Sequence, residues 1–201
     1  MNKPIYYGSM MLETGDTDSL ISGLTTHYPN TIKPALQTVG MKEGLKVVAG
    51  LYIVVTKKQV YFLADCTVNV NPSSEILAEI AISAADTVQA FDVIPRIAML
   101  SFSNFGSAPY PESIKVREAT KLVKKLRPEL ICDGEMQADT AVVPQIIEQE
   151  FSFSEIRGGA NVLIFPDLNS GNIAYKLMAR IGEATVIGPV LMGMKKSIHV
   201  L

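Results

Sequence analysis

The sequence predicts an α/β protein, a three-layer α/β/α sandwich with a mostly parallel sheet. Between residues 96 and 181, a short apolar segment, a polar loop and an amphipathic helix follow one another three times. Such alternation is typical of parallel sheets that are covered by helices on both faces. The composition agrees, because 48% of the 201 residues are hydrophobic and 19% are charged, which provides a core and excludes a disordered chain.

Two strands and a helix precede the repeated pattern. β-branched and aromatic residues predict strands at 47–55 and 60–64. A helix should follow, with Asn71 as its N-cap and Pro72 in its first turn. Its buried stripe would consist of the apolar residues at positions 76, 80, 84 and 88.

The repeated units supply the rest of the predicted sheet and its helices. Their strands should cover residues 96–100, 130–132 and 161–165. Their helices should include residues 112–126, 143–147 and 173–181. An apolar segment at 186–193 predicts a last buried strand with its turn.

Charge, hydropathy and cysteine content exclude several classes of protein. A net charge of −2 gives no basic surface for nucleic acid. No apolar run reaches the roughly 18 residues that cross a bilayer, so no membrane partner is predicted. Cys66 and Cys132 lie far apart in apolar segments, and no signal peptide precedes them, which predicts reduced core thiols and a cytoplasmic protein. His27 and His199 stand alone, so we expect no metal site.

Three polar loops follow predicted strands: SFSNFGS (101–107), DGEMQAD (133–139) and FPDLNSGN (165–172). Ligands of open α/β sheets bind where strands end and helices begin, and three such loops at one edge favour a binding site. The alternative for each loop is an ordinary turn or N-cap, which requires the same small polar residues. Neither the GxGxxG nor the GxxxxGK[ST] nucleotide motif is present.

Longer motifs carry a resemblance to a known family. The run ADCTVNVNPSSEILAEIAISAADTVQAFDVIPRIAMLSFSNFGS, the segment DGEMQADTAVVP and the segment from ANVLIFPDLNSGN to the last residue resemble the phosphate acetyltransferase family, and the resemblance covers essentially the whole chain. It implies a fragment of a two-subdomain fold. Residues 1–40 would belong to the first subdomain, 41–191 to the second, and 192–201 would return towards the first.

Two subfamilies share these motifs. Asn104, Phe105, Glu135, Met136 and the closing MKKSIHVL resemble the carboxy-terminal domain of bacterial NADP-dependent malic enzymes, whereas PDLNSGN resembles the stand-alone enzyme. The resemblance to the first implies a regulatory domain that binds acetyl-CoA as an effector and is not itself catalytic. NADP, a divalent metal and the oxidative decarboxylation of malate to pyruvate would then belong to a malic-enzyme domain in cis. We expect this reading over a truncated phosphate acetyltransferase or a purely structural domain.

Departures from the enzyme pattern support that expectation. His27 and Tyr28 stand where the family has hydroxyl residues, and Lys33 replaces an arginine that suits phosphate. The family's serine–arginine pair and catalytic aspartate would follow the position of Leu201, so we expect this chain to lack them.

The resemblance places SFSNFGS at the cleft between the subdomains, where acetyl-CoA would lie. It predicts no catalytic residue in this chain and a homodimer through the second subdomain. The candidate acetyl-CoA-binding residues are Lys33, Ser101, Ser103, Asn104, Gly106, Ser107, Gln137 and Asp139.

Overall fold

A computed structural model describes residues 4–26 and 28–200 of the chain. Its strands are β1 (Ser19–Ser22), β2 (Ala49–Val55), β3 (Val60–Ala64), β4 (Arg96–Leu100), β5 (Ile131–Met136), β6 (Val162–Ile164), β7 (Thr185–Met192) and β8 (Ser197–Val200). Its helices are α1 (Pro4–Thr14), α2 (Tyr28–Thr38), α3 (Ser74–Gln89), α4 (Pro111–Leu126), α5 (Ala138–Val142), α6 (Pro144–Glu150) and α7 (Leu168–Arg180).

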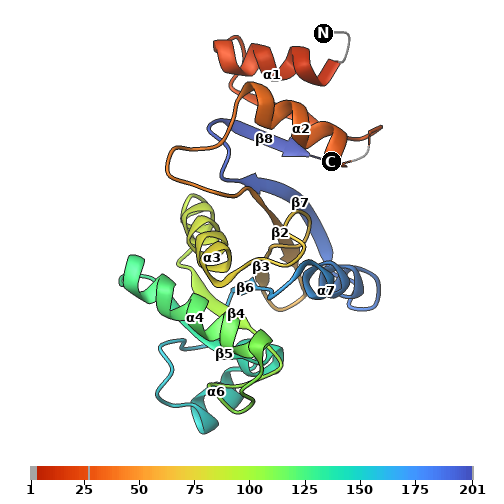
Figure 1. The fold of residues 1–201 in the computed structure, drawn as a ribbon. Coiled ribbons are helices and arrows are strands. Elements are labelled where there is room, and N and C mark those ends of the chain that lie inside the picture. Colours follow the sequence, from red (N-terminus) through yellow and green to blue (C-terminus); the bar gives the residue numbers. More distant parts are fainter. Residues whose placement is uncertain (1–3, 27, 201) are drawn as a thin grey trace.

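The strands form one sheet in the order β1-β8-β7-β2-β3-β6-β4-β5 (Figure 1). The β1–β8, β3–β6, β6–β4 and β4–β5 pairs are parallel, whereas the pairs around β7 and β2 are antiparallel. The prediction of a mostly parallel α/β sheet is therefore confirmed. Because β3, β6, β4 and β5 run in one direction, their carboxyl ends meet at the same edge.

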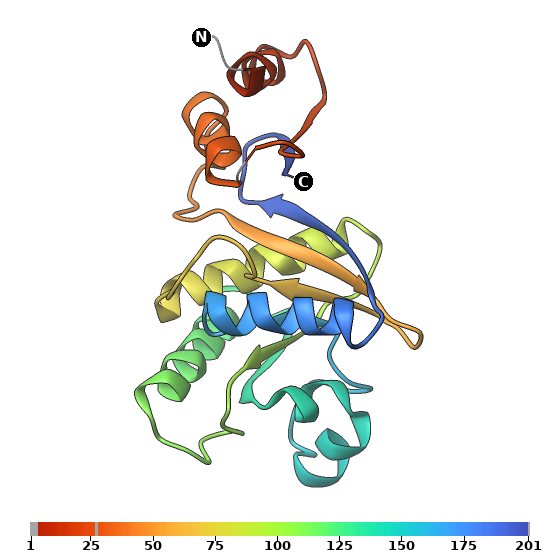
Figure 2. The ribbon, with the colours of Figure 1, turned by 90° about the vertical axis from the view of Figure 1, so that its right-hand side faces the viewer.

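Helices cover both faces of this sheet, as the alternation of the sequence predicts. On β4, Ile97 and Met99 pack in one core cluster with α3 and α4, while Ala98 and Leu100 pack in a second with α5, α6 and α7. This division follows from the pleat, which points successive side chains to opposite faces. Figure 2 shows α7 lying across the second face.

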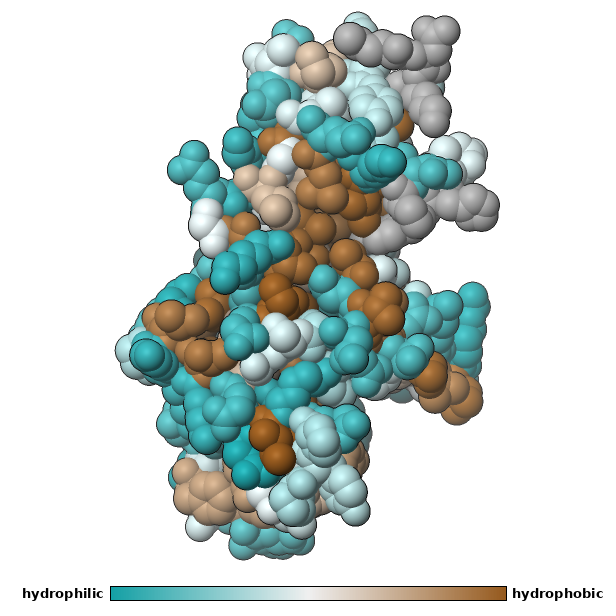
Figure 3. Space-filling model, viewed as in Figure 1, coloured by the Kyte–Doolittle hydropathy of each residue, from teal (hydrophilic) through white to brown (hydrophobic). Residues whose placement is uncertain are grey.

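A smaller group of elements, α1, α2, β1 and β8, lies at one end of the sheet (Figure 1). It surrounds a third apolar cluster, which includes Leu12, Ala35 and Ile198. Val48, just before β2, and Leu191 on β7 extend this cluster. Figure 3 shows hydrophobic side chains where the group meets the rest of the molecule.

Most predicted elements are confirmed, and the errors concern where helices and strands begin and end. Asn71 is not the N-cap of α3; the Ser73 hydroxyl accepts from the Ile76 N–H instead. The predicted strand at 130–132 extends to Met136, so much of DGEMQAD is strand rather than loop. Within residues 4–26 and 28–200, no helix is both long and apolar enough to cross a bilayer.

Gly171 allows α7 to pack directly against the end of β3. A Cβ at this position would lie 2.5 Å from the Asp65 carbonyl oxygen and 3.2 Å from the Cys66 sulfur. We expect Gly171→Ala to lower the free energy of unfolding by about 1–3 kcal/mol because backbone would have to move. That cost outweighs the gain of about 1 kcal/mol that alanine brings to a helix interior.

Urea denaturation measures this difference. The exposed Lys176→Ala, on the same helix, is the matched control and should change stability little. A Gly171→Ala protein as stable as the natural one would contradict the predicted close packing.

Candidate functional site

A cleft of about 390 Å³ opens at the edge where the parallel strands end. Five segments contribute to it: the loops after β3, β4 and β6, and the first turns of α4 and α7. Its lining residues are Val70, Asn71, Ser101, Phe102, Glu112, Lys115, Pro166, Asp167 and Asn169. Two of the three polar loops predicted from the sequence therefore meet here, together with the loop after β3.

Lys115 connects three of these segments. From α4, its Nζ donates to the Asn71 Oδ1 at 2.9 Å and to the Pro166 carbonyl oxygen at 2.9 Å. Burial lowers the pKa of Lys115, although the carboxylates of Asp167 and Glu112 act in the opposite direction. An ammonium group has three N–H donors, so one donor remains for a ligand in the cleft.

Two carboxylates give the cleft a mixed charge. Asp167 is the N-cap of α7, and its Oδ1 accepts from the Ser170 N–H at 2.9 Å. Glu112 lies in the first turn of α4. A cation and carboxylates close together can hold an anionic oxygen and accept a proton from a bound thiol.

The loop 101–107 is held mainly by bonds within the protein. Ser101 is partly exposed and lines the cleft, but Ser103 is fully buried. The Ser103 hydroxyl donates to the Glu135 Oε1 at 3.0 Å and lies 3.2 Å from the Ser107 Oγ. The Ser107 Oγ also accepts from the Asn104 N–H at 3.0 Å, and Gly106 takes a φ of +93°, which favours glycine.

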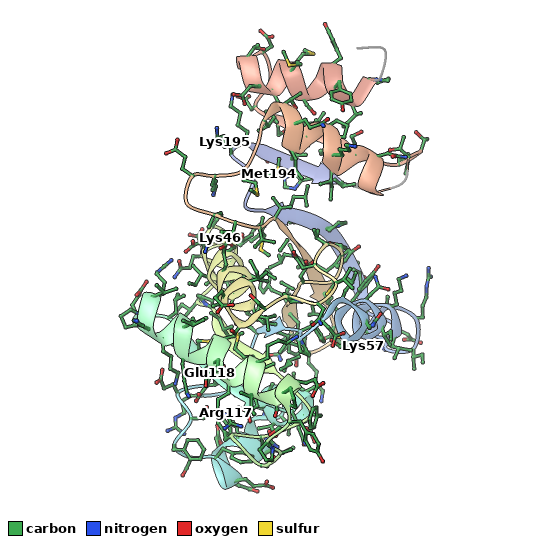
Figure 4. All side chains as sticks on the ribbon, in the orientation of Figure 1. Lys46, Lys57, Arg117, Glu118, Met194 and Lys195 are labelled. Carbon is green, nitrogen blue, oxygen red and sulfur yellow. The ribbon has the colours of Figure 1, made fainter. Side chains whose placement is uncertain are left out.

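An ion pair between the buried Glu135 and the partly exposed Arg117 lies beneath this loop. The Glu135 carboxylate accepts from the Arg117 Nε at 3.0 Å and from the Gly106 N–H at 2.7 Å. Burial acts to raise the pKa of Glu135, but Arg117 and the N–H donors outweigh it, so that pKa is lowered. Figure 4 labels Arg117 on α4, the helix that also carries Lys115.

The remaining predicted residues lie in two places. Gln137 braces the same loop, since its N–H donates to the Asn104 Oδ1 and its Nε2 to the Phe102 carbonyl oxygen. Asp139 accepts from the Thr140 N–H in α5. Lys33 is exposed on α2, in the group of elements at the other end of the sheet, and does not line the cleft.

The structure thus brings most of the predicted residues together but places only Ser101 of the eight on the cleft wall. That the others contact a ligand stays a prediction. His27 and the Tyr28 side chain, which replace hydroxyl residues of the family pattern, lie outside the described residues.

Sequence reasoning missed Lys115 and Asn71 as cleft residues, and it included Asp167 only as part of the candidate loop 165–172. The amphipathic pattern of residues 112–126 predicts that Lys115 faces solvent, and Asn71 is predicted as an N-cap. The available signal was the polar run after residue 64, which follows a strand just as the other polar loops do.

The described residues contain no group of three histidine, cysteine or acidic side chains that could hold a metal ion. Cys66 and Cys132 are buried and unpaired, and burial raises the pKa of both thiols. Neither thiol is therefore suited to nucleophilic chemistry.

Comparison with known proteins gives a consistent result. The sequence model of the family Phosphate acetyl/butaryl transferase matches residues 1–201. The chain is 44% identical to the phosphate acetyltransferase of Bacillus subtilis strain 168, covering 96% of this chain and 60% of that protein. It is 41% identical to the Escherichia coli K12 phosphate acetyltransferase, covering 97% of this chain and 27% of that protein.

Solved structures agree with the sequence comparisons. The EutD phosphotransacetylase from Staphylococcus aureus superposes with a TM-score of 0.92 at 37% identity, covering 98% of this chain and 61% of that one. A phosphotransacetylase from Streptococcus pyogenes gives 0.91 at 41% identity, with coverages of 96% and 59%. The chain therefore spans about 60% of the Bacillus subtilis protein and of these two structures, and 27% of the Escherichia coli protein.

These matches contradict the prediction of a non-catalytic regulatory domain of a malic enzyme. The residues that favoured it are few, whereas identity to phosphate acetyltransferases extends over almost the entire chain. With a family match along its full length, the chain belongs to the phosphate acetyl/butaryl transferase family.

Proposed function

We propose that this chain is part of a phosphate acetyltransferase, which transfers an acetyl group between coenzyme A and inorganic phosphate. The observation that carries the proposal is the identity of 41–44% to proteins of that name over nearly the whole chain. Acetyl-CoA, predicted from the sequence as an effector, is then a substrate.

The cleft supplies groups that suit this reaction. Phosphate needs donors, and the free N–H of Lys115 and the hydroxyl of Ser101 offer them at one edge of the sheet. The developing charge on the acetyl oxygen needs the same kind of donor. In the direction that forms acetyl-CoA, the thiol of coenzyme A must lose a proton, and the carboxylate of Asp167 can accept it.

We expect Lys115→Met, tested in the full-length protein, to raise the KM for phosphate about tenfold or more. The methionine keeps most of the apolar stem but removes the charged donor, and a bond to a charged group contributes about 1.5–3 kcal/mol. Formation of acetyl phosphate from acetyl-CoA, followed through loss of the thioester absorbance, measures the effect.

Lys121→Met is the matched control, because Lys121 lies on the same helix and its side chain is 65% exposed in an ion pair with Glu118. It should leave both kcat and KM unchanged. No acetyl transfer by the full-length protein would refute the proposed function, and a normal KM in Lys115→Met would place the phosphate elsewhere.

A homodimer through the second subdomain is also part of the proposal. Ile173, Leu177 and Ile181 are 57%, 51% and 78% exposed although all three are large and apolar. Ile173 and Leu177 lie on one face of α7, and Ile181, its C-cap, follows at the same spacing of four. Figure 2 shows α7 on the outside of the sheet. A second copy of the chain would cover this stripe, and an obligate interface buries roughly 2,000 Å² or more.

We expect Leu177→Glu to convert the dimer into monomers at micromolar concentration, because a carboxylate would be buried without a partner. Sedimentation equilibrium of the full-length protein gives the mass. Lys176→Gln, on an exposed neighbouring position, should remain dimeric. A monomeric natural protein, or a dimeric Leu177→Glu, would contradict the use of this face.

We place the protein in the cytoplasm, as its sequence predicts. The two buried, unpaired thiols support this assignment, since reducing compartments keep cysteines unpaired.

A further inference from the structure

We infer that Glu135 and Arg117 are positioning residues that set the shape of the cleft wall formed by the loop 101–107. This inference rests on the proposed function, because it takes the cleft as the place where acetyl transfer occurs. Neither residue lines the cleft; both would act through Ser101 and Phe102, which do.

The first step of the argument is where the carboxylate lies. Glu135 reaches from β5 beneath the neighbouring loop, and its side chain is 0% exposed. Its Oε1 accepts from the Ser103 hydroxyl at 3.0 Å and from the Gly106 N–H at 2.7 Å. One carboxylate oxygen therefore fixes two points of the loop that are three residues apart.

The second step is the counter-charge. The Arg117 Nε donates to the other oxygen, Oε2, at 3.0 Å, and its second amino group donates to Oε1 at 3.3 Å. Two parallel hydrogen bonds from one guanidinium fix the orientation of the carboxylate as well as its distance. Because a buried carboxylate without its partner is strongly unfavourable, Arg117 also determines whether Glu135 stays under the loop.

The third step is the backbone on either side of Glu135. The Glu135 carbonyl oxygen accepts from the Phe105 N–H at 2.8 Å, and the Met136 carbonyl oxygen accepts from the Ser101 N–H at 2.8 Å. Gln137 then binds the Phe102 carbonyl oxygen and the Asn104 side chain. Three successive residues at the end of β5 thus hold the loop along most of its length.

Ser101 and Phe102 lie at the first positions of this loop, next to the end of β4. If the Glu135–Arg117 pair is lost, the bonds at Ser103 and Gly106 weaken, and both cleft residues can shift relative to Lys115, which lines the cleft from α4. A displacement of about 1 Å at a reacting group can cost on the order of 10²-fold in rate.

The test compares Glu135→Gln, Arg117→Met and Arg117→Lys in the full-length protein, with Lys121→Met as the control on the same helix. Hydrogen exchange, read by mass spectrometry, reports directly on the amides of residues 101–108. We expect exchange there to be at least about tenfold faster in Glu135→Gln and Arg117→Met, intermediate in Arg117→Lys, and unchanged in Lys121→Met. Circular dichroism selects the variants that remain folded.

Kinetics provide the second readout. We expect kcat/KM for acetyl transfer to fall about 10²-fold in Arg117→Met and Glu135→Gln, with partial recovery in Arg117→Lys, while Lys121→Met stays normal. Faster exchange with unaltered kcat and KM would overturn the inference, since the loop would then be irrelevant to the reaction.

Failure of the proposed function is distinguishable from failure of this inference. A natural protein without acetyl transfer would refute the function, and the exchange rates alone would then decide whether Glu135 and Arg117 hold the loop. Exchange rates in the folded variants that equal those of Lys121→Met would overturn the positioning role whatever the activity.

Discussion

The parallel pairing of β3, β6, β4 and β5 is the constraint on which the rest of the structure depends. It brings the carboxyl ends of these strands to one edge, so loops that are far apart in the sequence become neighbours. Gly171 contributes to this arrangement, because its lack of a side chain lets α7 pack directly against the backbone at Asp65. The cleft exists because of this convergence, and its polar lining follows from what strand ends contain.

Helix α4 then connects the loops through two cations on different sides. Lys115 reaches the loops after β3 and β6, and Arg117, two positions along, reaches Glu135 on β5. The two contacts differ in kind. Lys115 keeps a donor for a ligand, whereas Glu135 is fully buried with its oxygens occupied within the protein. This contrast separates a cation that has a donor left over at the cleft from groups that hold the cleft wall in place.

The polar loop SFSNFGS illustrates why small polar residues are ambiguous. A turn and a ligand site require the same donors and acceptors, and the sequence does not reveal which of them are already used. The side chains of Ser103 and Asn104 form hydrogen bonds with Glu135 and Gln137, and the Ser107 hydroxyl accepts from the Asn104 N–H. The few residues that indicated a malic-enzyme domain include Glu135 itself, whose visible role is to brace this loop.

By itself the sequence determined the α/β class, most strands and helices, and the polar edge, because hydrophobic periodicity and turn chemistry are local properties. The buried stripe of α3 at Ile80, Ala84 and Val88 follows from periodicity alone. Only the tertiary structure decided which polar groups face the cleft. The helical pattern predicts that Lys115 faces solvent, but in the structure its Nζ lies 2.9 Å from acceptors in the loops after β3 and β6. These contacts depend on the order of the strands in the sheet, which no local pattern encodes.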